Sequence, residues 1–516
     1  MLAFDVNSPD LIMINESGKW LRDSGRVSIA GGKVTVASGM PVYGVQLVYN
    51  TALERGAKIF GDAGERGYGN LEWRGIVAER LMPWYMHIDE AGKQSFIGVM
   101  VQPNSFVGLR AAAKSVTVDI DLRSGNGPVN LLDRSIEACT LVSEFNCEAD
   151  PFAFQRQMLR RLCPVSKLAK QPVYGGNNWY YAYGVSSREN ILADSEFISA
   201  MSPNAENRPY MVIDDGWQLH HKEQGSCCGG PWIGNEDYGD MAVLAADMRA
   251  LGVKPGIWIR PLLEAERPMT EWITGKTDKN WQTDPSIPEV VNHVRGIVRS
   301  IRRMGYELIK HDFTTWDIFG HWGFQVNGRR MNPDRRLADN TRTNAEIILN
   351  LYRAIAEEAG EDCPVIGCNT VSHLAAGIFQ IQRTGADTSG RNWERTRYMG
   401  LNTLAMRMPQ HRIFYDCDAD CAPITDEVAW KLSERWLDVL SKSGTPLFVS
   451  ADPKKMGGLQ KQALREAFSR AAVNVTPAQP LDWQENTAPR IWKFADSVTE
   501  YDFDAFYGYD DSAWWR

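Results

Sequence analysis

Residues 306–315 read Tyr-Glu-Leu-Ile-Lys-His-Asp-Phe-Thr-Thr, a short apolar run that delivers one charged residue, Asp312, at its end. Such a run is typical of a strand that is buried on both faces in a parallel sheet. Similar runs occur at 172–181, 208–218, 254–263, 363–369, 378–388, 412–420 and 445–450. Most are separated by stretches of helical spacing, such as the valines and isoleucines between 290 and 301. Eight strands that alternate with helices predict a (β/α)8 TIM barrel over 172–455.

The flanking regions show a different pattern. Segments 27–39, 43–50, 95–103 and 115–125 alternate apolar and polar residues, which predicts an N-terminal β-sandwich over residues 1–165. A helix is predicted near 151–170, before Pro172. Residues 456–516 are predicted to form a barrel-closing helix and a small C-terminal β region, the latter from segments 491–498 and 501–516.

Bulk properties exclude several classes of partner. The 516 residues are 44% hydrophobic with a formal charge of −8, and we find no basic tract that would neutralise a run of phosphates, so nucleic acid is not expected. No apolar segment reaches the roughly 18 residues that a membrane span needs. The start resembles no signal peptide and predicts a cytoplasmic protein, although a trimmed signal stays open. The nine cysteines show no zinc spacing, so neither metal nor cofactor is expected.

Carboxylates at strand ends suggest a chemistry. Retaining hydrolysis of a glycosidic bond needs two carboxyl groups about 5 to 5.5 Å apart, and a barrel supplies them where its strands end. Asp312 is the candidate nucleophile, with Lys310 on the same strand face to keep it ionised. Asp387 ends the sixth run and is the candidate general acid/base. Asp214 and Asp215 end the second run, where paired acceptors can hold two sugar hydroxyls.

Other strand ends carry less specific signals. Arg260, Cys368 and Asp416 end the third, fifth and seventh runs. Arg260 could bind an anionic substituent of a sugar or, as we favour, neutralise Asp214, Asp215 or Glu264. The insert at 220–237, with adjacent cysteines and histidines, is expected to overhang the site. Eighteen tryptophans and 17 tyrosines suit either sugar stacking or core packing.

These residues resemble the α-galactosidases of glycoside hydrolase family 36, with their relatives in family 27, across all three regions of the chain. The resemblance rests on Ile213-Asp214-Asp215-Gly216-Trp217-Gln218, on Lys310-His311-Asp312, on Arg383-Thr384-Gly385-Ala386-Asp387-Thr388, and on the strand ends 367–369 and 416–420. It implies that Asp312 is the nucleophile and Asp387 the acid/base. The substrate contacts that it implies are Trp179, Asp214, Asp215, Lys310 and Arg383. Trp217, Arg260 and Cys368, at the same strand ends, are further candidates for substrate contact.

The sequence also departs from the family pattern. The N-terminal region is short, His311 stands where a tryptophan is usual, and Arg260 stands where relatives often carry glutamate. The last change could alter the substrate preference.

The leading functional hypothesis is release of a terminal α-galactose through a covalent intermediate, without a cofactor. The same site could serve α-N-acetylgalactosamine or β-L-arabinopyranose, or transfer the sugar to another sugar. A catalytically inactive sugar-binding barrel is an alternative from a different class, and a metal-dependent isomerase or aldolase is a third. The expected partner is a glycoside or oligosaccharide, and a homo-oligomer is possible.

Overall fold

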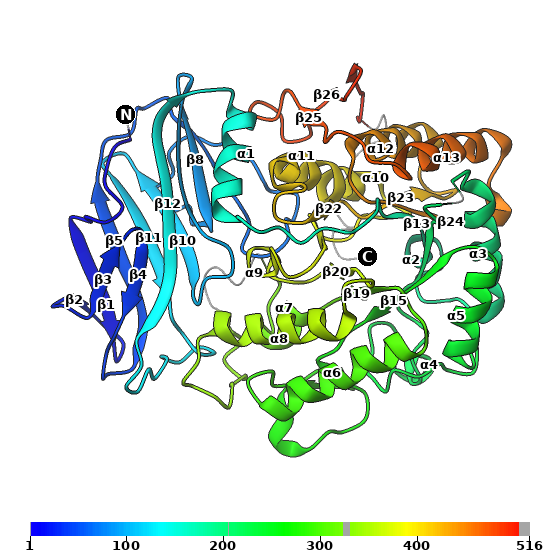
Figure 1. Ribbon diagram of the computed structural model, residues 1–516, viewed down its shortest axis with the longest axis horizontal. Helices are drawn as coiled ribbons and strands as arrows, with labels where there is room; N and C mark the ends of the chain where they lie inside the picture. The colour runs from blue at the N-terminus through cyan, green and yellow to red at the C-terminus, as the bar shows by residue number, and fades with distance from the viewer. Residues whose placement is uncertain (1, 205, 324–330, 505–516) are drawn as a thin grey trace.

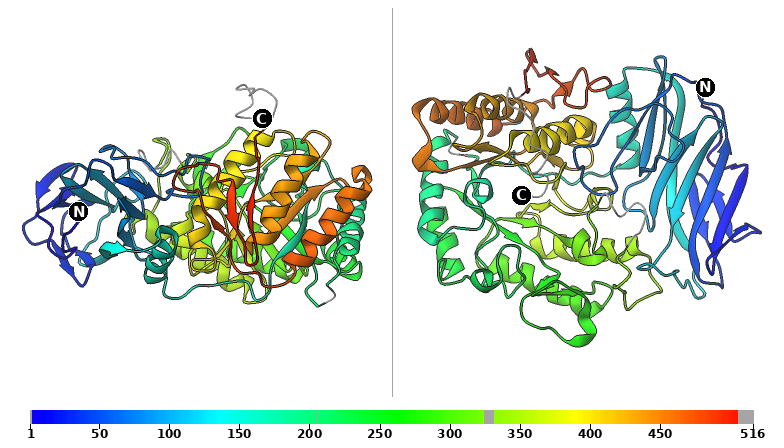
Figure 2. Two further views of the ribbon diagram at one scale, coloured as in Figure 1. Left: turned by 90° about the horizontal axis from the view of Figure 1, so that it is seen from above. Right: turned by 180° about the vertical axis from the view of Figure 1, so that it is seen from behind.

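The computed structural model describes residues 2–204, 206–323 and 331–504. A β-sandwich built from the first 150 residues lies beside a larger barrel, and the two views of Figure 2 show them side by side (Figures 1 and 2). Within the described residues no helix is long and apolar enough to cross a membrane.

The sandwich consists of two six-stranded sheets whose inner faces form one apolar core. Its strands alternate as the sequence predicts: in Ser115–Asp121, Val116, Val118 and Ile120 are buried while their neighbours are half-exposed. The first sheet has the order β2 (Lys19–Arg22), β1 (Leu11–Glu16), β5 (Val42–Asn50), β11 (Ser115–Asp121), β10 (Phe106–Ala112), β7 (Met82–Pro83). The second has the order β3 (Val27–Ala30), β4 (Lys33–Val36), β12 (Ile136–Glu148), β9 (Lys93–Val99), β8 (Tyr85–Glu90), β6 (Lys58–Gly61).

The central sheet is a closed parallel barrel, as predicted. Its strand order is β22 (Asp416–Asp418), β21 (Ile381–Arg383), β20 (Val365–Gly367), β19 (Leu308–His311), β15 (Lys254–Ile259), β14 (Tyr210–Ile213), β13 (Tyr174–Asn177), β24 (Leu447–Ala451), β23 (Cys421–Ile424). Strands β22 and β23 are two halves of the seventh strand, separated by Ala419 and Asp420, and they pair with β21 and β24 respectively. The ring therefore closes with eight strand positions, and each contains one of the eight predicted runs.

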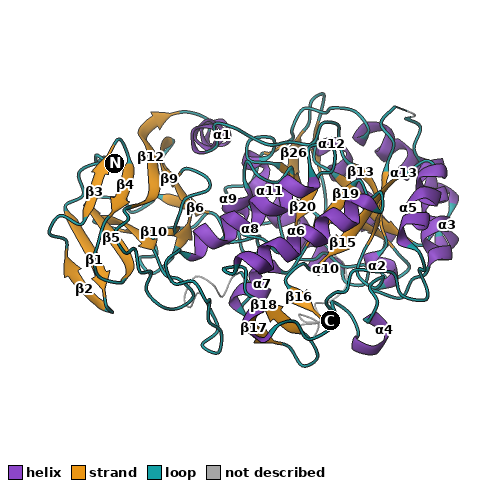
Figure 3. Cartoon of the chain, turned by 60° about the horizontal axis from the view of Figure 1, so that its bottom comes forward, coloured by secondary structure: helices purple, strands orange, loops and turns teal. Residues whose placement is uncertain are grey.

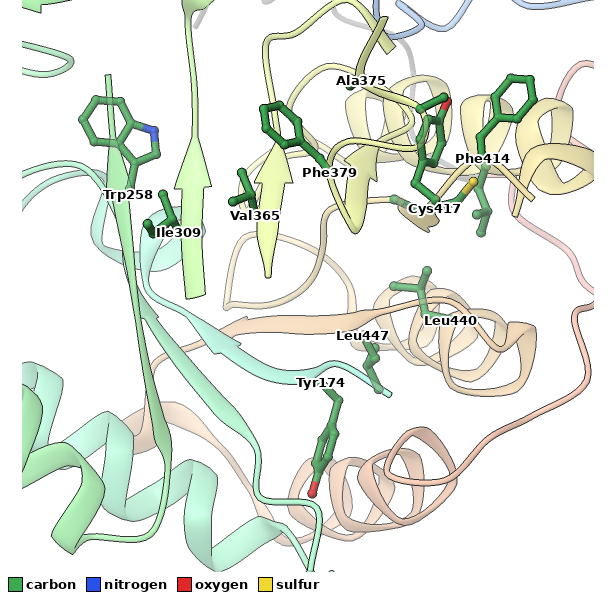
Figure 4. Close-up of a cluster of buried hydrophobic side chains, with 14 of the residues drawn as sticks. Tyr174, Trp258, Ile309, Val365, Ala375, Phe379, Phe414, Cys417, Leu440 and Leu447 are labelled. Atoms are coloured by element: carbon green, nitrogen blue, oxygen red, sulfur yellow. The ribbon is translucent and has the colours of Figure 1, made fainter. Parts of the chain in front are cut away.

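Helices cover the outside of the barrel, and apolar side chains such as Ile309, Val365 and Leu447 fill the space between the layers (Figures 3 and 4). The predicted stripe from Val290 to Ile301 is buried along α6. The principal covering helices are α3 (Arg188–Met201), α5 (Met241–Ala250), α6 (Pro288–Arg303), α8 (Asn344–Ala359), α12 (Trp430–Ser443) and α13 (Gly458–Ala471). Shorter helices occur at the strand ends: α2 (Trp179–Ala182), α4 (His221–Gln224), α7 (Thr314–Phe319), α9 (Ser372–Ala375), α10 (Trp393–Thr396) and α11 (Thr403–Arg407). A small sheet, β16 (Leu263–Glu264), β18 (Trp281–Thr283) and β17 (Ile273–Lys276), follows β15.

Helix α1 (Pro151–Leu162) joins the two large regions; Asp150 caps it by accepting from the Ala153 N–H. After the barrel, α13 is followed by a small antiparallel sheet of β25 (Gln479–Pro480), β26 (Ile491–Lys493) and β27 (Val498–Glu500). Of the predicted segment 501–516, residues 505–516 lie outside the described residues. The boundaries at 165, 172 and 455 stay predictions.

Candidate active site

The side chain of Asp312 is fixed from three sides at the end of β19. Its Oδ1 accepts from the backbone N–H groups of Phe313 (2.8 Å) and Asn369 (3.1 Å), and its Oδ2 accepts from Trp258 Nε1 (3.0 Å). Phe313 adopts a left-handed φ of 61°, which is uncommon for a residue with a side chain and turns its N–H back to the carboxylate. Asp312 therefore has one fixed orientation at the carboxyl end of the barrel.

Lys310 contacts Asp214 rather than Asp312. Its Nζ donates to Asp214 Oδ2 at 2.7 Å, and Asn177 Nδ2 donates to the same oxygen at 2.6 Å. Burial lowers the pKa of Lys310, but the Asp214 carboxylate outweighs it, so the pKa lies well above the usual range. Lys310 is thus a permanent cation between β14 and β19, and its direct partner differs from the one that strand spacing suggested.

Asp215 is buried beside Asp214 and is held by the insert that follows β14. Its Oδ1 accepts from Gln218 Nε2 (2.7 Å) and its Oδ2 from the Cys227 N–H (2.7 Å). Burial raises its pKa, and the Gln218 hydrogen bond opposes that effect. The expectation that the insert at 220–237 folds over this end of the barrel agrees with the Cys227 contact.

Asp387 lies four residues beyond β21 and its side chain is 41% exposed. Two guanidinium groups face its Oδ1: Arg383 at 3.4 Å and Arg66, from the N-terminal region, at 3.7 Å. Burial raises the pKa of Asp387, but Arg383, then Arg66 and Lys310, outweigh it and hold the pKa well below the usual range. Asp387 is therefore ionised when the site is empty.

Cys368 and Asp420 complete the surroundings of Arg383. The Cys368 sulfur accepts from Arg383 Nη1 (3.3 Å) and from Arg66 Nη1 (3.5 Å), and burial raises the pKa of its thiol well above the usual range. Asp420 Oδ2 accepts from Arg383 Nη2 (2.6 Å) and from the hydroxyl of Tyr180. Asp312 and Asp387 thus belong to one connected cluster of β19, β20 and β21, because Cys368 is adjacent to Asn369.

Three sequence-based expectations need correction. Trp217 has no exposed surface; its Nε1 donates to the Trp258 carbonyl (2.9 Å), so it supports Trp258 instead of offering a face to a sugar. Asp416 begins β22 instead of ending it and accepts from the Ala169 N–H (3.2 Å) at the opposite end of the barrel. Its run is longer than the strand, because residues 412–414 form a turn before β22.

Arg260 is the third correction, because it neutralises Asp317 and none of the three carboxylates we named. Its Nε and Nη2 donate to Asp317 at 2.9 and 2.7 Å, and its Nη1 donates to the Cys227 carbonyl at 2.8 Å. The guanidinium also lies 4.2 Å from the centre of the Phe313 ring. Trp179 is half-buried at the start of α2, and its ring centroid lies 5.7 Å from that of Tyr183; its role in stacking on a sugar stays a prediction.

Sequence reasoning missed Arg66, Glu65 and Trp258, and it named Asn369 and Asp420 only as parts of the strand ends 367–369 and 416–420. A charged pair between glycines in Gly64-Glu65-Arg66-Gly67 was the available signal for the first two, and Trp258 lay inside the apolar run 254–263.

Fold and carboxylates together define a (β/α)8 protein whose polar side chains converge at the carboxyl ends of its strands, where such barrels carry their active sites. Solved structures with similar folds are known. An α-galactosidase from Thermus thermophilus, in complex with p-nitrophenyl α-D-galactopyranoside, matches with a TM-score of 0.62 and 16% identity over 95% of this chain and 98% of that one. No family model matches the chain.

Two further solved structures have a similar fold. The family 36 α-galactosidase from Geobacillus stearothermophilus matches with a TM-score of 0.61 and 12% identity, over 90% of this chain and 69% of that one. The galactosidase domain of an α-galactosidase–sucrose kinase matches with a TM-score of 0.59 and 13% identity, over 86% and 63%. The fold is that of the family 36 α-galactosidases across all three regions.

Proposed function

We propose that the protein is a retaining α-glycoside hydrolase that releases terminal α-galactose. The observation that carries the proposal is the fixed geometry of Asp312: three donors orient its carboxylate at the end of β19, inside a cluster that also holds Asp387. A nucleophile gains rate from such fixed orientation. The similarity to α-galactosidase structures supports galactose as the sugar.

In the first step Asp312 attacks the anomeric carbon and forms a glycosyl ester while Asp387 donates a proton to the departing oxygen. In the second step Asp387 accepts a proton from water, which attacks the ester and releases the sugar with its original configuration. The ionised state of Asp387 in the empty site suits the second step directly. For the first step, bound substrate has to displace water and raise the pKa of Asp387 by desolvation.

We assign substrate contacts to six residues at the carboxyl ends of the barrel strands: Trp179 for stacking, Asp214 and Asp215 for hydroxyl groups, and Lys310, Cys368 and Arg383 for the groups nearest the reacting carbon. The hydrogen bonds that Asp214 and Asp215 already accept fix the direction of their remaining lone pairs, as recognition of two neighbouring hydroxyls requires.

The test is a comparison of initial rates for wild type and Asp312→Ala on 4-nitrophenyl α- and β-glycosides of galactose, N-acetylgalactosamine, glucose and arabinose. We expect release from the α-galactoside and its loss in the variant. Preferential release from an α-N-acetylgalactosaminide or a β-L-arabinopyranoside would show that the preferred sugar is not galactose and would leave the proposed retaining mechanism unchanged. Turnover of none of these glycosides by wild type would contradict the proposal.

A further inference from the structure

A segment of the N-terminal region extends into the barrel mouth. The Gly67 N–H donates to the Thr384 carbonyl (2.8 Å), and the Ala386 N–H donates to the Gly67 carbonyl (2.9 Å), so the segment binds the chain directly before Asp387. A Cβ atom on Gly67 would lie 2.7 Å from Thr403 Cγ2 and 3.3 Å from the Thr384 oxygen. Only glycine permits this close approach. The segment therefore has a defined position on the barrel.

Glu65 lies within this segment and is only 1% exposed. Its Oε1 accepts from Asn369 Nδ2, and its Oε2 accepts from the Tyr68 hydroxyl at 2.7 Å. Its backbone carbonyl accepts from Ser372 Oγ (2.8 Å) and Arg407 Nη2 (2.6 Å). A carboxyl group held at both oxygens and at its own backbone has a defined position in the barrel mouth.

Asn369 connects Glu65 to the nucleophile. Its backbone N–H donates to Asp312 Oδ1 at 3.1 Å, while its side-chain amide donates to Glu65. Its carbonyl accepts from the Thr315 N–H and hydroxyl, both at 3.1 Å. We propose that Glu65 is a positioning residue for Asp312, acting through Asn369, so that the N-terminal region is part of the catalytic machinery. This inference rests on the proposed function, in which Asp312 is the nucleophile.

The charge of Glu65 changes near neutral pH. Burial raises its pKa to about 7; Arg66 opposes this, and the Asp312 carboxylate adds to it. The charged and titratable groups that face it are Arg66 and Tyr68 on its own segment, Asp312 after β19, and Arg407 on α11 with its partner Asp62. Below about pH 7 Glu65 is neutral, and above it a second negative charge lies near the nucleophile.

The test compares Glu65→Ala with Glu65→Gln by steady-state kinetics across pH. Glu65→Ala frees the Asn369 amide, so we expect kcat to fall about tenfold to a hundredfold with little change in KM, because a misplaced nucleophile slows chemistry rather than binding. Glu65→Gln still accepts from Asn369 and should keep most of the wild-type kcat below neutrality, while the inflection near pH 7 disappears. Asp416→Asn is the matched control: burial also raises the pKa of Asp416, to about 6, but at the opposite end of the barrel.

A wild-type kcat and pH profile in Glu65→Ala, alongside an inactive Asp312→Ala, would overturn the inference and leave the proposed function standing. A second readout does not need activity. The carbonyl band of protonated Glu65, obtained as the infrared difference between wild type and Glu65→Gln, should titrate near neutrality and move to lower pH in Asp312→Asn, because a charge that raises the pKa is removed. If the titration midpoint of Glu65 does not move in Asp312→Asn, the proposed coupling between Glu65 and Asp312 is wrong, even if the protein turns over no glycoside.

Discussion

The end of β19 and the loop after β21 hold their carboxylates in opposite ways. Asp312 directly follows its strand, is buried, and receives three hydrogen bonds at its carboxylate. Asp387 lies four residues beyond its strand, its side chain is 41% exposed, and two guanidinium groups face its Oδ1 at 3.4 and 3.7 Å. The first environment fixes geometry, and the second sets charge while leaving the side chain accessible.

The difference matches the two roles in retaining hydrolysis. A nucleophile must be oriented toward one carbon atom, so backbone donors and an indole are suitable partners. An acid/base must exchange a proton with substrate and water, so it needs exposure and a tunable pKa. The two environments, more than the two residue types, assign the roles.

Alanine substitution of the two carboxylates should give the largest losses of activity and should distinguish the two roles. Asp312→Ala should reduce kcat by at least about 10⁴-fold on every substrate, because the covalent step is lost. Asp387→Ala should lose about 10²- to 10⁴-fold on a sugar leaving group, but much less in the first step on a 4-nitrophenyl glycoside, whose phenolate needs no proton. Added azide should give a β-galactosyl azide with the first variant and an α-galactosyl azide with the second. Equal losses of kcat on both substrates for both variants would contradict the assignment of different roles to Asp312 and Asp387.

The Arg260–Asp317 pair should affect stability more than chemistry. Removing one partner leaves a buried charge, so Asp317→Asn should lower the free energy of unfolding by about 3 to 5 kcal/mol. The double variant Arg260→Met with Asp317→Leu, which removes both charges, should recover most of that loss in urea denaturation. A stable Asp317→Asn protein with altered sugar preference would instead favour Arg260 as a substrate contact.

Trp258→Phe tests the fixed geometry of Asp312 alone. It removes the Nε1 donor to Oδ2 but keeps an aromatic ring, and hydrogen bonds to charged groups contribute about 1.5 to 3 kcal/mol. We expect kcat to fall about 10- to 100-fold with KM nearly unchanged. Trp232→Phe, which keeps the ring contact with Trp258 but touches neither carboxylate, is the control. Equal kinetics for both variants would show that the indole donor is not needed.

Arg66→Met should have the smallest effect, a shift in pH dependence. Without this cation the pKa of Asp387 should rise, so Asp387 stays protonated to higher pH and the alkaline limb of kcat, which reports the substrate-bound enzyme, moves upward by about one pH unit or less. The sign follows from the cation's preference for the ionised carboxyl group. A downward shift would contradict the role of Arg66 as a partner of Asp387.

The pattern of buried strands was sufficient to predict the barrel, because apolar runs such as 306–312 have few other ways to be buried. It also placed Asp214, Lys310 and Asp312 together, since the carboxyl ends of parallel strands meet at one end of a barrel. The seventh run misled because its apolar residues before Asp416 form a turn, so the residue expected at the mouth lies at the base.

Arg66 and Glu65 could not be predicted from local patterns. They lie about 300 residues from Cys368 and Asn369, in a segment without periodicity, and reach the site only because the sandwich docks on the barrel. The partner of Arg260 was equally hard to predict, because Asp317 lies on the short helix α7, which begins after the left-handed Phe313. Contacts that depend on docking or on a single backbone turn carry no periodic signal.

Covalent trapping tests the central assignment most directly. Wild type incubated with 5-fluoro-α-D-galactosyl fluoride, then digested and analysed by mass spectrometry, should carry one fluorogalactosyl group on Asp312, in the peptide that contains Lys310 and His311. The control is Asp312→Ala, which should carry none. Labelling of another carboxylate in wild type, or hydrolysis of an α-galactoside with inversion and no adduct, would contradict the account.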